Sequence, residues 1–460
     1  MVHSYPMANY TVFNPYQLHP ENIEDPPRTY RGIFRRIGPG LILASSIVGS
    51  GELIATTVLG AEHGYTLLWL IVLSCVVKIV VQNELGRYTI GTGETTLEAF
   101  DRVPGPRLRA SWLVWAWFLM CMFMLMQVGG MLGGISEILH RLVPSVPIAG
   151  WVWIVNLVTV LLLMGGRYWV VERVSMGLVV CFTALTVSCA FLLLKLPQYF
   201  SWSDILGGLS FRLPEGGLMT AVAAFGITGV GATELVVYPY WCIEKGYARY
   251  SGPRDNSPAW RRRAMGWVRV MGVDVVNSMV IYTFATIAFY LLGAGILHEQ
   301  GLVPKGSEMV QILSNMYTKT LGSWSLPLFL GGAFAVLYST IFAGTAAHSR
   351  VFADFAGILK FYDKTDYSKR LQVSRMLVVA LLFLPSLYFF FLRAPVLMVL
   401  IGGLAQALML PVIAFFTIYL RYRHMPKAIL PKEWVTAVLW LSAVVMTIMM
   451  GYYLVQRLVG

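Results

Sequence analysis

The sequence has few charged residues and no long polar stretch between its apolar segments. Only 13% of its 460 residues are charged and 57% are hydrophobic, whereas roughly 25% of an average soluble protein is charged. Apolar stretches follow one another from about residue 37 to residue 455, and no low-complexity tract divides them. This composition excludes an ordinary soluble domain and predicts a polytopic membrane protein with one integral membrane domain, residues 37–460.

Further absences narrow the class. Residues 1–36 begin with a polar, proline-rich stretch without the apolar core and cleavage site of a signal peptide, so we expect an aqueous tail. The five cysteines lack metal-ligand spacing, which indicates packing residues. No nucleophile, base and orienting group occur together, and no glycine-rich phosphate loop is present. We therefore expect neither an enzyme nor a bound cofactor.

Apolar segments long enough to cross a bilayer predict an all-α protein. A span needs about 20 apolar residues. Eleven segments qualify, near 37–61, 65–90, 110–139, 148–165, 173–195, 216–243, 266–297, 324–348, 372–392, 395–420 and 434–456.

The distribution of Lys and Arg predicts the orientation of these spans. The N-terminal tail and alternate loops hold 27 of the 35 basic residues. Because cytoplasmic loops carry the excess of Lys and Arg, we expect a cytoplasmic N-terminus, an external C-terminus and a location in a bacterial-type plasma membrane. The net charge of +12 then reflects topology, and a nucleic-acid partner is not expected. Lipid and a small solute are the expected partners, and no oligomeric state is predicted.

Two spans contain glycine-rich interruptions, each followed by a carboxylate. They are SIVGSGEL at 46–53 and GITGVGATEL at 226–235. Broken backbone at membrane depth is tolerated only where it faces protein or a watery cavity. The first and sixth spans would be equivalent helices of two five-helix halves with opposite topology, a pattern typical of inverted-repeat transporters. The alternative is that these glycines only allow close helix packing.

The first two spans resemble a known family. IGPGLILASSIVGSGELIATTVLGAEHGYTLLW, residues 37–69, and GRYTIGTGETTLEAF, residues 86–100, are similar to the first two helices of the NRAMP (natural resistance-associated macrophage protein) family of divalent metal-ion transporters. The resemblance continues loosely over the remaining spans. It implies a LeuT-type fold of two inverted five-helix repeats, with discontinuous helices 1 and 6 and an added eleventh helix.

The chain departs from the family in the first helix. NRAMP transporters bind metal there with an Asp-Pro-Gly-Asn motif. The corresponding residues of this chain are Gly49, Ser50, Gly51 and Glu52. The metal-binding aspartate is therefore missing, and Glu52 offers a carboxylate three residues further along.

The sixth helix departs as well. The family has an Ala-x-x-Met motif followed by a histidine. Ala232 is kept, whereas Leu235 stands at the methionine position and Val237 at the histidine position. Because a thioether favours transition metals over hard cations, its loss suggests a preference for a harder ion such as Mg²⁺.

Glu52 and Glu234 are the predicted metal ligands. Carboxylates beside backbone carbonyls form the ligand set of hard divalent cations. The alternatives are that Glu234 pairs with Lys78 or a backbone amide, and that Glu52 only stabilises the N-terminal end of a half-helix.

Lys78 lies within the second span. A lysine near mid-membrane costs on the order of 3 kcal/mol on insertion scales, which makes it a functional candidate. We expect either a built-in cation or a coupling group, and the alternative is an ion pair with Glu84 or Glu52. Further candidates for coupling or gating are Gln127, Asp274 and Gln406. Asp274 has the alternative role of a polar residue near a helix end.

Three functions compete. The first is a divalent-cation carrier for Mg²⁺ or Mn²⁺ that works by alternating access. The second is a LeuT-fold carrier of an amino acid or amine, because IVGSGE also resembles the first helix of amino-acid and polyamine transporters. The third is a membrane sensor that has lost transport.

Overall fold

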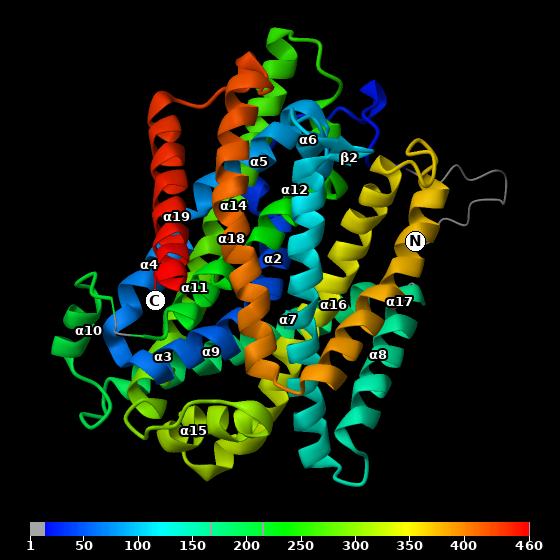
Figure 1. Ribbon diagram of the computed structural model, residues 1–460. Coiled ribbons are helices and arrows are strands. Elements are labelled where there is room, and N and C mark those ends of the chain that lie inside the picture. The colour runs from blue at the N-terminus through cyan, green and yellow to red at the C-terminus, as the bar shows by residue number, and fades with distance from the viewer. Residues whose placement is uncertain (1–13, 166–167, 214–215, 460) are drawn as a thin grey trace.

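The computed structural model describes residues 14–165, 168–213 and 216–459. The chain forms a bundle of long helices (Figure 1). The first five-helix half consists of α2 (Pro39–Ile47) with α3 (Thr57–His63), α4 (Leu68–Val77) with α5 (Ile79–Thr92), α7 (Trp112–Leu142), α8 (Ile148–Met164) and α9 (Tyr168–Leu193).

The second half repeats this order. It consists of α11 (Leu218–Ile227) with α12 (Ala232–Lys245), α14 (Pro258–Leu292), α16 (Leu326–Ile358), α17 (Tyr367–Leu392) and α18 (Pro395–Arg423), and α19 (Glu433–Val459) follows as the eleventh helix. The first helix of each half is broken, as the glycine-rich segments predict. A π-helical segment, Ser50–Thr56, links α2 to α3, and another, Gly293–Leu297, extends α14.

Short elements connect these helices. They are α1 (Tyr30–Phe34), α6 (Thr96–Asp101), α10 (Trp202–Gly208), α13 (Tyr247–Ser251), α15 (Met309–Leu321), an antiparallel pair of two-residue strands, β1 (Arg107–Leu108) and β2 (Ala110–Ser111), and 3₁₀ turns at Pro20–Asn22, Gly64–Leu67, Gly306–Glu308, Ser323–Ser325 and Lys427–Ile429. Figure 1 shows α15 lying across one end of the bundle.

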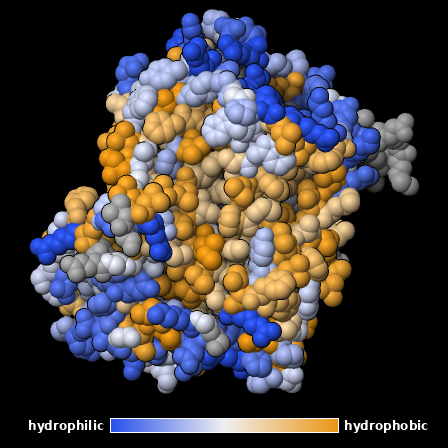
Figure 2. Space-filling model, in the orientation of Figure 1, coloured by the Kyte–Doolittle hydropathy of each residue, from blue (hydrophilic) through white to orange (hydrophobic). Residues whose placement is uncertain are grey.

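The surface agrees with a membrane environment. Figure 2 shows apolar side chains around the middle of one face and hydrophilic side chains at both ends. Among the described residues, eight helical stretches are long and apolar enough to cross a membrane, one of which joins α3, α4 and α5. The other predicted spans correspond to the interrupted first helix and to the shorter apolar helices Ile148–Met164 and Gly177–Leu193. The protein is therefore a multi-pass integral membrane protein.

Local sequence signals begin and end several helices. Ser257 accepts a hydrogen bond from the Trp260 amide and Pro258 occupies the first turn of α14, which satisfies a free N–H group and presets the backbone. Gly93 ends α5 in the left-handed conformation, with φ of 77°. In the interior, α18 packs against α7 and α11, so the tenth helix supports the broken sixth helix.

Candidate functional site

At the break in the sixth helix, the Lys78 ammonium binds backbone carbonyls that the end of α11 leaves free. The helix α11 ends at Ile227, and the chain turns at Gly229, whose φ of 63° favours glycine, before α12 begins. Lys78 is fully buried between α4 and α5, and its Nζ donates to the carbonyl oxygens of Phe225 and Thr228 at 2.6 Å each. The ammonium therefore lies at the C-terminal end of α11, where the helix dipole favours a positive charge.

The surroundings of Lys78 differ from the ion pairs that the sequence suggests. Ser74 donates to the same region and lies 2.8 Å from the Thr228 hydroxyl. Glu84 is engaged elsewhere, because Arg87 Nε lies 2.9 Å and Arg421 Nη1 3.0 Å from its carboxylate. This buried cluster joins α5 to α18, and the Lys78 charge is stabilised by backbone carbonyls instead.

Glu52 connects the two broken helices. Its Oε2 accepts from the Gly49 amide at 3.4 Å, and its Oε1 accepts from the Gly229 amide at 3.4 Å and from the Thr286 hydroxyl at 3.1 Å. The carboxylate is fully buried. One side chain thus contacts the first-helix break, the sixth-helix break and α14.

At Gly49, where the family has its metal-binding aspartate, the space for a side chain is filled by Thr340 from the second half. A Cβ atom on Gly49 would lie 2.1 Å from Thr340 Oγ1. The Thr340 hydroxyl lies 3.1 Å from the Ser46 carbonyl at the end of α2. A larger residue at position 49 therefore requires Thr340 to move. No sequence signal points to Thr340, because it lies far from Gly49 along the chain. For Ser50, the side chain lies outside the described part of the structure.

Three predicted residues, Glu234, Gln127 and Gln406, meet beside a small cavity of about 40 Å³. The Thr233 hydroxyl lies 2.9 Å from both Glu234 Oε2 and Gln406 Oε1, and Gln406 Nε2 donates to Gln127 Oε1 at 2.8 Å. Glu234, Gln127 and Gln406 all line the cavity, which lies between α7, α12, α16 and α18 and reaches Ser46. The sixth, third and tenth helices are thereby joined at the sixth-helix break.

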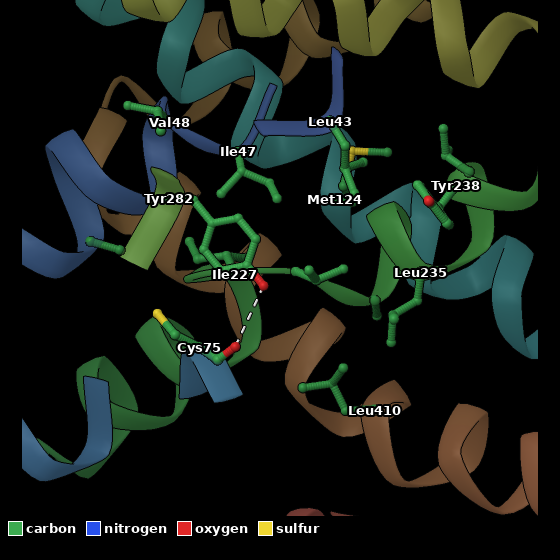
Figure 3. Packing of buried hydrophobic residues seen from close by; sticks show 14 of the residues in the cluster. Leu43, Ile47, Val48, Cys75, Met124, Ile227, Leu235, Tyr238, Tyr282 and Leu410 are labelled. Carbon is green, nitrogen blue, oxygen red and sulfur yellow. Dashed lines mark hydrogen bonds between the residues drawn. The ribbon is translucent and has the colours of Figure 1, made fainter. Parts of the chain in front are cut away.

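The two predicted metal ligands occupy different surroundings. Glu234 lines this cavity, whereas Glu52 is bonded to the two breaks and is not among the lining residues. Within the described ranges, no group of three or more His, Cys, Asp or Glu residues is arranged to hold a metal. Ala232 and Leu235 are fully buried, and Figure 3 shows Leu235 in the apolar cluster that also contains Ile227 and Leu410.

Asp274 caps the first helix from across the bundle. It lies in α14, and its carboxylate accepts from the Gly38 amide at 3.0 Å, the Gly40 amide at 2.5 Å and the Tyr238 hydroxyl at 3.2 Å. These amides are the free N–H groups at the start of α2, where a negative charge is favourable. The structure therefore gives Asp274 a role in holding α2.

His348 also lines the cavity, which the sequence does not suggest. The predicted eighth span ends at residue 348, so this histidine reads as a helix-end residue. Instead α16 continues to Ile358, and His348 lies inside the helix on the same face as Thr340 and Gly344. Apolar residues recur at helical spacing after residue 348, at Val351, Phe352, Phe355 and Ile358, which are buried, and this pattern could have shown that the helix extends.

Comparisons with known proteins match this architecture. A family model described as natural resistance-associated macrophage protein-like matches residues 40–456. The divalent metal cation transporter MntH of Deinococcus radiodurans is 22% identical over 446 residues, which cover 94% of this chain and 92% of the relative. An uncharacterized protein of Pasteurella multocida is 25% identical over 328 residues, 70% of each chain.

Two solved structures share the fold. A variant of the Eremococcus coleocola manganese transporter superposes with a TM-score of 0.60 at 16% identity and covers 94% of this chain and 90% of that one. The nucleobase-cation-symport-1 family transporter Mhp1, in a closed conformation, gives a TM-score of 0.56 at 13% identity, with 95% of each chain covered. The predicted LeuT-type fold of two inverted repeats plus an eleventh helix is thereby confirmed.

Proposed function

Because the chain belongs to the natural resistance-associated macrophage protein-like family, we propose that it is a secondary transporter that moves a divalent cation, Mg²⁺ or Mn²⁺, across the membrane by alternating access. Membership of this family of membrane transporters also argues against an enzyme. The proposal draws support from the relatives named as divalent metal cation and manganese transporters.

One observation carries the proposal: a carboxylate, Glu234, lines a cavity directly beside the sixth-helix break. Substrate sites of inverted-repeat transporters lie near the bilayer midplane at discontinuous helices. The amides Gln127 and Gln406 join the neighbouring helices to this point through hydrogen bonds. A cation bound by Glu234 would therefore contact the helices that must move in alternating access.

Glu52 is assigned to the conformational change and not to holding the cation in this conformation. Its carboxylate is bonded to both broken helices and to Thr286, so we assign it to coupling the movement of the two breaks. A direct contact between Glu52 and the cation, as the sequence suggests, remains part of the proposal for any conformation that opens this region.

The same proposal includes the topology. Residues 1–36 form a cytoplasmic tail and residues 37–460 one transmembrane domain, with the C-terminus outside, in a bacterial-type plasma membrane. The excess of basic residues in the tail and alternate loops supports this orientation.

The organic-solute alternative receives less support. It rests on the resemblance of the IVGSGE segment, and a lysine such as Lys78 would suit an anionic substrate, but the ammonium is bonded to the carbonyls of Phe225 and Thr228. Two of the three ammonium donors are therefore already engaged by backbone carbonyls.

Uptake into proteoliposomes tests the function. The purified full chain is reconstituted, and uptake of Mn²⁺ and Mg²⁺ is compared with that of Glu234→Gln. A matched control is Glu137→Gln, because Glu137 is also a buried carboxylate but lines a different cavity, with Ile148 and Phe389. We expect uptake by the wild type and the control and its loss in Glu234→Gln. Uptake of neither ion by the wild type would refute cation transport.

A further inference from the structure

We propose that His348 and Glu234 together form the cation-binding site of this conformation, so that the ion is held here between α16 and α12 and not at the first-helix break. This inference rests on the proposed function and names the site and its substrate class. The class is a divalent metal ion that accepts a nitrogen ligand beside carboxylate oxygens, with Mn²⁺ and the softer Cd²⁺ as probes.

The orientation of the His348 ring leaves one nitrogen available as a ligand. Nδ1 lies 2.7 Å from the Gly344 carbonyl oxygen, one helical turn earlier. A carbonyl oxygen can only accept, so Nδ1 carries the proton, and Nε2 of the neutral ring keeps its lone pair. Nε2 is buried and has no hydrogen-bond partner among the described residues. A neutral imidazole whose second nitrogen donates to a backbone carbonyl is the usual arrangement of a metal-binding histidine.

The same cavity brings a carboxylate to this imidazole. Glu234 and His348 both line it, and α12 contacts α16 directly. The Thr233 hydroxyl donates to Glu234 Oε2 at 2.9 Å, and that bond occupies one of several acceptor positions on the two oxygens. The carboxylate therefore keeps lone pairs for a cation.

Soft ligands face the cavity from the third helix. Met124 and Met131 are seven residues apart on α7, on the same side of the helix as Gln127, and both line the cavity. Imidazole and thioether groups suit transition metals, whereas Mg²⁺ prefers oxygen ligands in octahedral geometry. These methionines offset the loss of the family's methionine at Leu235.

The oxygen-rich positions at the two breaks are already engaged. Thr340 fills the space beside Gly49, and the ammonium of Lys78 holds the carbonyls at the end of α11. A second positive charge at those carbonyls would be repelled, because two unit charges 4 Å apart interact by about 4 kcal/mol at an effective dielectric of 20. The cavity lined by Glu234 and His348 is thus the favoured place for a cation.

Selectivity measurements test the site. The apparent affinities for Mn²⁺, Cd²⁺ and Mg²⁺ are measured in proteoliposomes for the wild type and His348→Gln. Even second-layer changes at metal sites cost about 10–100-fold in affinity, so we expect His348→Gln to weaken Mn²⁺ and Cd²⁺ at least about tenfold and Mg²⁺ less than about twofold. The control is His140→Gln, whose Nδ1 also bonds a backbone carbonyl, at Val146, outside the cavity.

Direct binding separates the site from transport. Mn²⁺ bound to the purified wild type and to His140→Gln should show electron-spin-echo coupling to an imidazole nitrogen, and His348→Gln should lose it. If His348→Gln does not fold, Met131→Leu, a volume-conserving change, should weaken Cd²⁺ more than Mg²⁺.

The outcomes distinguish the two proposals. Loss of all uptake in Glu234→Gln, combined with an unchanged Mn²⁺ to Mg²⁺ ratio and unchanged nitrogen coupling in His348→Gln, would overturn the His348 site and leave cation transport standing. Nitrogen coupling without uptake by the wild type would support the site and refute transport.

Discussion

Replacing Lys78 with methionine removes the ammonium from the sixth-helix break while keeping an unbranched side chain. Two hydrogen bonds to backbone carbonyls are lost, those to Phe225 and Thr228. Hydrogen bonds that involve a charged group contribute about 1.5–3 kcal/mol each, so the loss is about 3–6 kcal/mol. Removing a lysine from mid-membrane recovers on the order of 3 kcal/mol. We therefore expect the free energy of unfolding to fall by up to about 3 kcal/mol.

The Phe225 and Thr228 carbonyls left by Lys78→Met lead us to expect a second effect, on the response to salt. With the ammonium gone, the carbonyls lie at the negative end of the α11 dipole with Ser74 as their nearby donor. A monovalent cation can then take the place of the ammonium. Added Na⁺ or K⁺ should stabilise Lys78→Met and leave the wild type unchanged.

Unfolding by sodium dodecyl sulfate in mixed micelles measures both effects. Lys319→Met serves as the control, because Lys319 is exposed in the last turn of α15. Greater stability of Lys78→Met than of the wild type would refute the view that the ammonium holds the break together. A response to salt of the same size in the control would refute the cation substitution.

Three further substitutions test the surrounding framework in the same unfolding assay. Asp274→Ala removes the acceptor for the first amides of α2 and should cost about 1–3 kcal/mol, and a cost below that of exposed substitutions would argue against the cap. Gly229→Ala places a side chain at φ of 63° and should cost about 1–2 kcal/mol, so full stability would mean that the turn relaxes easily. Glu84→Gln leaves Arg87 and Arg421 without their shared carboxylate and should cost about 3–5 kcal/mol, which an unchanged unfolding midpoint would contradict.

The fold could be predicted from the sequence through its hydropathy and the hydrogen-bonding needs of the backbone. Spans, their order and the breaks at Gly49 and Gly229 follow from apolar runs and glycine clusters, because hydrocarbon forces each backbone group to be satisfied within a helix or beside a cavity. Gln127 and Gln406, which the sequence offers as coupling or gating candidates, line one cavity and are hydrogen-bonded to each other. They could be identified because polar residues in apolar spans are few and each needs a polar partner.

Only the tertiary structure decided which partners meet. Lys78 bonds carbonyls of the sixth helix instead of a carboxylate, Thr340 fills the space beside Gly49, and His348 joins Glu234 at one cavity. Each pair joins different helices, and the last two pairs both connect α16 to a broken helix, the first helix in one case and the sixth in the other. A pattern along one helix shows which face is polar, but the residue opposite depends on the rotation and crossing of two packed helices, which neighbouring side chains throughout the bundle determine together.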